Sequence, residues 1–378
     1  MKKTASLLVL ALAASAVAAA DPVEICSPGL KPSQMDAEGR LVEDWAKVGV
    51  KLFGEGVADG PIRVEATKVD GRIPAAEALS PRGPVTLRWT AYRAPIWPVG
   101  VDVLTVRVEE AAGQPADVTV ALDVPAGVQL GPRTARLGRR TVLTLPEEAL
   151  KEQPLREWGY ADEAATLAGW GKPDVKCDPA FRNIRAGMGG VPIVYRFSVT
   201  PKSAANVVLG FCESHWAEPA KRPLACRVEG ATPQQVDPVA AWGRHKPGAL
   251  VFAARDENGD GRLEVAVGPA PGASDRNPIL SAVWIFPPGD PPKPEKVVSG
   301  ALSAAAIRYV DVGGENDQSI YPPGKLEYRL KIPAGEAREL VFCVACPGGS
   351  APSPDSSPWT PETLRQAAAE VWRDWPQP

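Results

Sequence analysis

Histidine is scarce in this chain, which has only His215 and His245 among 378 residues. A Ser-His-Asp triad needs its own histidine, and a catalytic zinc site commonly uses two or three. The scarcity argues against both. Glycoside hydrolysis needs only two carboxyl groups at a set separation in space, and nothing in the sequence singles out two of the 45 acidic residues. We therefore do not expect catalysis by this chain.

Long apolar runs are also lacking, apart from one at the N-terminus. Lys2 and Lys3 precede an apolar run over 7–17, and Ala18-Ala19-Ala20 offers a small-residue cleavage site. This pattern is typical of a secretory signal peptide over 1–20, because the run is shorter than the ~20 residues of a membrane span. The sequence predicts no membrane span and a secreted or periplasmic protein, cleaved near Ala20.

Clusters of basic residues are missing as well. The chain has 42 basic and 45 acidic residues, and loss of Lys2 and Lys3 leaves 40 against 45. A mildly acidic surface without a basic run does not attract a phosphate backbone. We expect no nucleic-acid partner.

Six cysteines occur, at positions 26, 177, 212, 226, 343 and 346. An even number in an exported protein favours disulfides, and Cys212 with Cys226 is the favoured pair because they lie on runs that look like neighbouring strands. Cys343 and Cys346 have metal or redox spacing, but no second pair lies nearby. Free thiols, or pairing with Cys26 or Cys177, are the preferred interpretation there.

Short alternating apolar runs fill most of the chain. One example is Val85, Leu87, Trp89 and Ala91, and Gly or Pro turns separate such runs at roughly ten-residue intervals. This period is typical of an antiparallel β-sandwich. The sequence predicts an all-β protein of two sandwiches. An irregular arm over 21–39 leads to a large sandwich over 40–150 and 300–348, including a strand at 307–310, and a second sandwich over 151–290 is inserted in it.

The inserted segment has a specific order of features. It contains V-P-I-V-Y-R-F-S-V, then V-V-L-G-F-C-E-S-H-W, then L-A-C-R-V-E-G, and closes with N-P-I-L-S-A-V-W-I-F. These resemble the Y-x-F, F-x-E and N-P-I-L-x-A-I signatures of malectin-like carbohydrate-binding domains, over about residues 155–290. The resemblance implies a jelly-roll-like β-sandwich that binds a glycan through aromatic and acidic residues on loops at one end.

Residues around two loops of this unit suit sugar binding. Pyranose C–H surfaces stack on aromatic faces, and planar polar groups bind the hydroxyls. The candidates are Tyr195, Glu213, His215, Trp216 and Trp242. In the alternative interpretation, Tyr195 belongs to the core and Glu213 pairs with Arg222 or Arg227.

A second motif has oxygen ligands at calcium-loop spacing. Asp256, Asn258, Asp260 and Glu264 supply side-chain oxygens, and Arg262 supplies a backbone carbonyl. Position 12 of an EF-hand loop would be Glu, whereas Val267 stands here. The alternative is a hairpin turn without metal, since Asn-Gly and Asp-Gly are strong hairpin signals. A calcium ion bound here would be structural.

The C-terminal region predicts two spacers and a helix. Proline-rich 291–299 and Pro/Ser-rich 349–359 are linkers. Thr360, Pro361 and Glu362 begin an amphipathic helix over 360–375, with one apolar stripe that includes Trp372 and Trp375. This stripe must be covered by the large sandwich or by a protein partner.

The order of sandwich, linker and helix resembles the N-terminal half of bacterial glycoside hydrolases, in which such a helix leads into a catalytic (α/α) barrel. Three functions are considered, and one is a structural surface protein in which both sandwiches only mediate protein contacts. The favoured one is a secreted non-catalytic carbohydrate-binding or accessory protein. The alternative is the non-catalytic portion of a glycoside hydrolase whose barrel lies on another chain.

Overall fold

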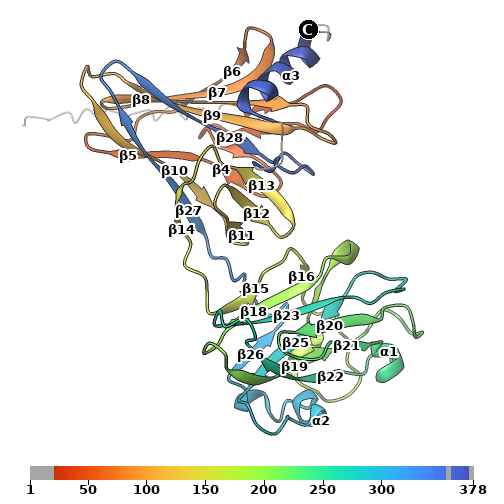
Figure 1. Cartoon of the computed structure of the whole chain (residues 1–378). Helices are drawn as coiled ribbons and strands as arrows, with labels where there is room; N and C mark the ends of the chain where they lie inside the picture. The colour runs from red at the N-terminus through yellow and green to blue at the C-terminus, as the bar shows by residue number, and fades with distance from the viewer. Residues whose placement is uncertain (1–20, 355–358, 374–378) are drawn as a thin grey trace, which may run out of the picture.

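The computed structural model describes residues 21–354 and 359–373. It forms two bodies built of antiparallel sheets (Figure 1), which confirms the all-β prediction. The predicted signal peptide and Trp375 lie outside the described residues. Within the described ranges, no helix has the length and hydrophobicity of a membrane span.

The first sandwich consists of three sheets. Its 8-stranded sheet has the order β11 (Val128–Leu130), β12 (Thr134–Leu137), β13 (Arg140–Thr144), β28 (Ala337–Val344), β9 (Val101–Glu110), β8 (Val85–Ala94), β7 (Ile73–Arg82) and β6 (Arg63–Val69). A 4-stranded sheet has the order β14 (Leu150–Glu152), β27 (Gly324–Ile332), β10 (Ala116–Val124) and β5 (Val50–Gly54). A second 4-stranded sheet joins β1 (Val23–Ile25), β2 (Ser33–Met35), β3 (Leu41–Val42) and β4 (Lys47–Val48).

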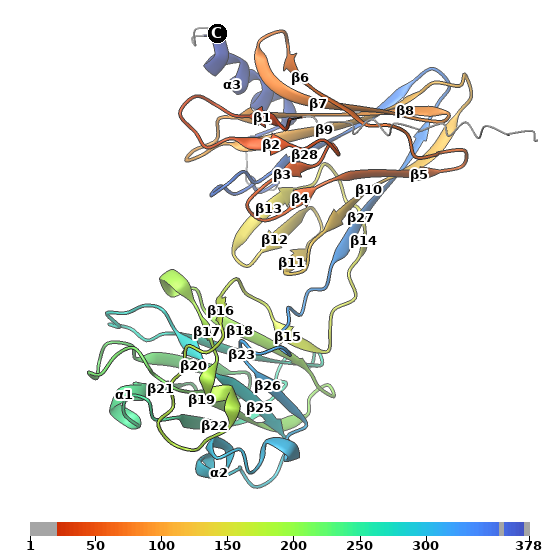
Figure 2. The ribbon, with the colours of Figure 1, turned by 180° about the vertical axis from the view of Figure 1, so that it is seen from behind.

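Strands from both ends of the chain share these sheets. All nine residues of β27 pair with β10, and β28 pairs with β9 from Val344 opposite Asp102 to Ala337 opposite Glu109. Everything from β15 to β26 therefore lies between strands that pair with each other. Figure 2 shows the two chain segments that connect the bodies.

The core of the first sandwich follows the alternation seen in the sequence. Val85, Leu87, Trp89 and Ala91 of β8 are each at most 1% exposed, and the residues between them are half-buried. Removal of such side chains from water is the main favourable contribution to folding, about 25 cal/mol per Å² of apolar surface.

The second sandwich also consists of three sheets. A 5-stranded sheet has the order β15 (Trp158–Tyr160), β18 (Ile193–Ser198), β23 (Arg262–Pro269), β20 (Leu224–Val228) and β21 (Gln234–Val236). Facing it, β22 (Gly248–Arg255), β19 (Ala204–Phe211), β25 (Ala282–Phe286) and β26 (Arg308–Asp311) form a 4-stranded sheet. A 3-stranded sheet of β16 (Ala165–Leu167), β17 (Ile184–Ala186) and β24 (Ile279–Leu280) lies at one end.

The β22-β19-β25-β26 sheet is buried on both faces. Val207 and Leu209 of β19 point into the core between the sheets, whereas Val208 packs in a separate cluster on the other face with Phe181 and Trp284. The 3-10 turn Pro179–Arg182 and helix α2 (Pro294–Val298) contribute to this second cluster. The sheet is therefore the middle layer of this body.

Three expectations about the segments were wrong. The strand at 307–310 was assigned to the large sandwich, but β26 pairs with β25 in the second one. The segment 291–299 was expected to be a linker, but α2 packs on β22 and Val297 is fully buried. The arm over 21–39 contains β1 and β2, whose Ile25 and Met35 are fully buried. For 291–299 and 21–39, burial of a few apolar side chains outweighs an irregular or proline-rich local sequence, whereas β26 shows that alternation does not say which sheet a strand joins.

Helix α3 (Pro361–Arg373) packs on the outer side of the 8-stranded sheet, against β7 and β8. Its buried residues are Leu364, Ala368 and Trp372. These three residues of the stripe are thus covered by this chain's own sandwich, and a protein partner on this helix stays a prediction.

The favoured disulfide is not formed. All six cysteines are free. Cys212 packs in the outer cluster beside β19, whereas Cys226 of β20 lies in the core between the sheets. β19 pairs with β22 and β25, so the two runs are not neighbouring strands. Burial raises the pKa of Cys212 to about 11 and that of Cys226 to about 12.

A buried polar cluster links the β1-β2-β3-β4 sheet to the 8-stranded sheet. Glu43 accepts a hydrogen bond from the Ser33 hydroxyl at 3.0 Å, and Arg93 donates to that hydroxyl at 2.7 Å. Arg93 also pairs with Asp102, which is fully buried. Burial, together with the neighbouring Asp102 carboxylate, raises the pKa of Glu43 to about 10. Glu43 is therefore protonated in the folded protein at neutral pH.

We expect Glu43 to make the protein less stable as pH rises. The pKa of Glu43 lies near 10 in the folded protein, and its ordinary value is 4.5. The contribution of Glu43 to the free energy of unfolding is therefore complete below pH 4.5 and is lost as the pH rises from 4.5 to 10. Glu43→Gln keeps a neutral hydrogen-bonding group without this cost. Urea unfolding at pH 8 should show the variant more stable by up to about 5 kcal/mol, because pH 8 lies 3.5 units above the ordinary pKa of 4.5 and one pKa unit corresponds to about 1.4 kcal/mol. Identical pH slopes for the variant and the unchanged protein between pH 5 and 8 would contradict this assignment.

Candidate functional site

The chain that follows β19 forms a loop at one end of the second sandwich. Glu213, at its start, is 1% exposed, and its Oε1 accepts the backbone N–H groups of His215 and Trp216 at 2.7 and 3.1 Å. Its Oε2 pairs with the Arg222 guanidinium. Glu213 therefore shapes the loop from inside, with its carboxylate engaged by these internal contacts. Of the two interpretations, pairing with Arg222 is confirmed.

Arg222 is buried between two carboxylates. Its Nη2 lies 2.6 Å from Asp275 Oδ2, and its Nε donates to the same oxygen at 3.1 Å. Asp275 Oδ2 also accepts from the Trp216 indole N–H at 2.8 Å, and Oδ1 accepts from the Asn277 backbone at 3.0 Å. Burial alone would raise the pKa of Asp275, but the bonds from Trp216 and Arg222 hold this pKa below its ordinary value. Two loops distant in sequence are thereby locked together.

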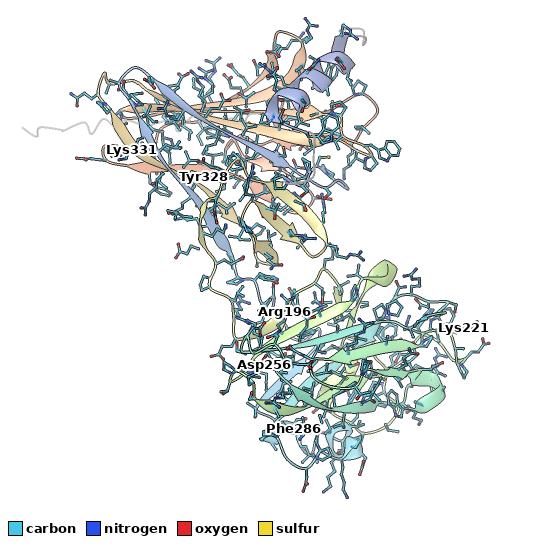
Figure 3. The ribbon with its side chains drawn as sticks, in the orientation of Figure 1. Arg196, Lys221, Asp256, Phe286, Tyr328 and Lys331 are labelled. Carbon is cyan, nitrogen blue, oxygen red and sulfur yellow. The ribbon has the colours of Figure 1, made fainter. Side chains whose placement is uncertain are left out.

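A cavity of about 220 Å³ lies beside this triad. Its apolar wall comes from the β16-β17-β24 sheet, with Leu167, Ile184, Ala186 and Ile279. Its rim carries Trp170, Met188 and His215, and its polar side carries Arg222, Asp275 and Asn277. Met188 is 57% exposed, so its side chain meets solvent at the rim of the cavity. Lys221 marks this end of the sandwich in Figure 3.

The rim provides what a sugar ring requires. Trp170 is half-buried, and the Arg222 guanidinium lies over its ring at 5.7 Å. The exposed His215 ring meets Trp216 edge-on at 4.6 Å. Asn277 uses Oδ1 to accept the Gly189 N–H at 2.7 Å, and its amide nitrogen has no partner among the described residues. An aromatic face beside fixed donors and acceptors fits the C–H surface and hydroxyls of a pyranose.

Tyr195, like Glu213, is a candidate that the structure places in the interior. It is fully buried, and its hydroxyl donates to Asp317 at 2.5 Å. Asp317 also pairs with Arg185, whose guanidinium lies 3.5 Å over the Tyr160 ring. Burial raises the pKa of Tyr195 well above its ordinary value. The prediction that Tyr195 contacts a sugar was wrong, because its alternation on β18 places it on the core face.

The two predicted tryptophans do not share a site. Trp216 is half-buried, with its indole nitrogen committed to Asp275 and Lys221 Nζ 5.8 Å over its ring. Trp242 follows the short helix α1 (Pro238–Ala241), stacks on Phe211 at 6.2 Å, and lines a different cavity of about 320 Å³ with Pro294 and Glu295. His215 therefore lines the cavity of about 220 Å³, and Trp216 packs against His215 without lining that cavity.

The Asp256 segment forms the turn between β22 and β23. Asp256 is fully buried and accepts three backbone N–H groups, from Lys202, Gly259 and Gly261. Burial alone would raise the pKa of Asp256, but these three bonds hold it below its ordinary value. Asn258 and Asp260 each accept a backbone N–H two residues on. Gly259 and Gly261 have φ of 80° and 76° and take the left-handed conformations that the turn requires.

The remaining predicted ligands are also engaged. Glu264 pairs with Arg196 at 2.9 Å, and Arg262 donates weakly to a carbonyl at 3.5 Å. Across the part of the chain that the structure describes, no group of three or more His, Cys, Asp or Glu residues is placed to hold a metal. This geometry favours the hairpin-turn interpretation, and a calcium ion at Asp256, Asn258, Asp260, Arg262 and Glu264 stays a prediction.

The sequence did not predict that one cavity is lined by Trp170, Met188, Arg222, Asp275 and Asn277. They lie up to about a hundred residues apart, and the sequence shows no periodic signal that links them. The charged pair within A-S-D-R-N-P, directly before the N-P-I-L signature, was the one local hint.

The chain is thus an all-β protein whose second sandwich carries a small cavity with an aromatic rim. No family model matches it, and no curated protein matches it. Solved structures similar to it include the ANX2 ectodomain from Arabidopsis thaliana, at 12% identity and a TM-score of 0.27, covering 70% of this chain and 88% of that one.

A Bacteroides uniformis beta-glucuronidase is similar at 11% identity and a TM-score of 0.28, over 51% of this chain and 28% of that one. A GH115 4-O-methyl-alpha-glucuronidase, BtGH115A, is similar at 11% identity and a TM-score of 0.22, over 34% and 16%. Likeness at this level is shared by sandwiches of unrelated function, so the site itself must carry the functional argument.

We expect calcium chelation to leave the thermal midpoint unchanged, because the turn's oxygens already accept its own N–H groups. An ion bound only by the folded state would raise stability. Thermal melts with excess EGTA and with millimolar CaCl₂ test this. A midpoint several degrees higher in calcium, lost in Asp260→Asn, would instead establish the metal site.

Proposed function

We propose that this chain is an exported, non-catalytic carbohydrate-binding protein, and that its second sandwich binds a sugar in the cavity at Trp170 and His215. The N-terminal signal-peptide pattern supports export. The malectin-like signatures support a glycan ligand. The observation that carries the proposal is the aromatic face of Trp170 beside polar groups held in place by the Arg222 triad.

The volume of the cavity limits the size of the ligand that it can bind. Pockets for drug-sized ligands have about 300–1,000 Å³, whereas this one has about 220 Å³. It therefore accepts a single ring, with the rest of a glycan extending past Met188 and His215 into solvent. Apolar Leu167 and Ile279 would contact the C–H side of that ring, and Asn277 its hydroxyls.

The same geometry argues against catalysis at this site. Glycoside hydrolysis needs one carboxyl group kept protonated as a general acid. Asp275 has its pKa lowered by Trp216 and Arg222, and Glu213 is 1% exposed beneath the loop. Both carboxylates serve to fix Arg222, so neither is free to transfer a proton to a leaving group.

A glycan array with the protein from Asp21 onward, followed by calorimetry on the best ligand, tests the proposal. We expect Trp170→Ala to weaken binding about tenfold or more, because a stacking surface worth about 1.4 kcal/mol is removed. His215→Ala should weaken binding less. Trp97, which is 91% exposed on the first sandwich, provides the matched control, and Trp97→Ala should bind normally.

Absence of any glycan ligand, or full binding by a folded Trp170→Ala variant, would contradict the proposal. Turnover of an aryl glycoside by the purified chain would contradict the non-catalytic assignment.

A further inference from the structure

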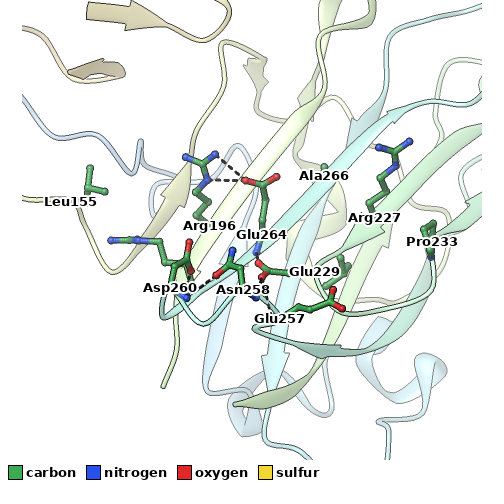
Figure 4. A pocket seen from close by; sticks show the side chains of 12 residues that line it. Leu155, Arg196, Arg227, Glu229, Pro233, Glu257, Asn258, Asp260, Glu264 and Ala266 are labelled. Carbon is green, nitrogen blue, oxygen red and sulfur yellow. Dashed lines mark hydrogen bonds and ion pairs between the residues drawn. The ribbon is translucent and has the colours of Figure 1, made fainter. Parts of the chain in front are cut away.

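The outer face of the β15-β18-β23-β20-β21 sheet carries an open trough of about 680 Å³. Outward-facing side chains of β18, β23 and β20 line it, and the 256–261 turn forms one wall (Figure 4). Arg196 and Asp256, beside this trough, lie at the opposite end of the sandwich from Lys221 in Figure 3. The trough is therefore separate from the cavity at Trp170.

Strand register places three arginines on this face. Arg196 lies opposite Glu264, and Arg227 lies opposite Ala266, two residues further along β23. Arg262 begins β23 on the same face, four residues before Ala266. At about 3.3 Å per residue, Arg227 and Arg262 are therefore separated by about 13 Å along the strand direction.

Two of these guanidinium groups have no carboxylate partner among the described residues. Arg196 is neutralised by Glu264, and Figure 4 joins these two by dashed lines. In the same view the exposed Arg227 stands apart from the acidic side chains. Arg262 makes only the 3.5 Å contact with the Arg156 carbonyl. The guanidinium N–H donors of both arginines are thus available, and their planar arrangement matches the oxygens of a carboxylate or sulfate.

Most acidic groups of the trough already accept hydrogen bonds from the protein itself. Glu229 accepts backbone N–H groups of Glu257, Asn258 and Glu264 at 3.1–3.3 Å. Asp260 accepts the Arg262 N–H at 2.8 Å. The exposed Glu257 at the tip of the turn keeps the trough from being strongly basic. This balance suits a ligand with separated acidic groups and disfavours a dense polyanion.

We propose that this trough is a second binding site, which takes an acidic saccharide whose carboxylate or sulfate groups are held by Arg227 and Arg262. The floor supports this assignment, because Ala266 is small and leaves room for a sugar ring beside Arg227, while Glu264, between the two arginines, is neutralised by Arg196. The proposal goes beyond a sugar at Trp170 and concerns a different ligand chemistry.

Calorimetry with the protein from Asp21 onward tests it, using an oligogalacturonate, its neutral methyl ester and a sulfated oligosaccharide. We expect at least one acidic probe to bind, with affinity that falls as salt rises, and the ester not to bind. The preferred acidic probe identifies the group that the trough recognises. Arg227→Gln and Arg262→Gln should each weaken its binding about tenfold, since each removes a charge-assisted contact.

Arg182→Gln is the control, because Arg182 is exposed on the same sandwich and does not line the trough. Trp170→Ala should retain acidic-probe binding even if it loses another glycan, which separates this inference from the proposed function. Equal binding of ester and acid, or unchanged binding in the folded double variant Arg227→Gln/Arg262→Gln, would overturn the proposal. Binding of neither acidic probe would also overturn it.

Discussion

The buried guanidinium of Arg222 is the constraint on which the candidate site depends. A charge taken out of water is costly unless it is fully paired and hydrogen-bonded. Glu213 and Asp275 meet this requirement from two loops about 60 residues apart, and their remaining oxygens accept N–H groups from the same loops. One ion triad therefore sets the loop path at His215, the position of Trp216 and the turn that carries Asn277. Loss of either carboxylate would leave Arg222 with an incomplete shell, so the loops and the cavity depend on the triad together.

The junction between the two bodies obeys a different constraint, which is backbone proximity. Gly159 has φ of 156°, and a Cβ there would lie 2.5 Å from the Ile320 nitrogen and 2.6 Å from the Gln318 carbonyl. Tyr160 and residues 318–320 exchange backbone hydrogen bonds at this point. The chain thus enters and leaves the second sandwich side by side, which allows β14 and β27 to pair just before and after it.

The sequence predicted the features that follow from period and composition. The alternation over β8 predicted its buried face correctly, and the apolar stripe predicted for the C-terminal helix includes Trp372, which α3 buries. Alternation cannot say which sheet a strand joins, so β26 was assigned to the wrong body. Nor can it separate a core aromatic from a rim aromatic, as Tyr195 shows. The cavity itself was out of reach, because Trp170, Arg222 and Asn277 meet only through tertiary packing.

We propose the cavity at Trp170 as a sugar site that the Arg222 triad holds in shape. A crystal structure of the complex with the best array ligand is its most direct test. We expect one pyranose ring against Trp170, with its hydroxyls bonded to Asn277 and His215 and with the triad unchanged. A ligand bound elsewhere, with the cavity filled by Met188 or Leu167, would contradict it.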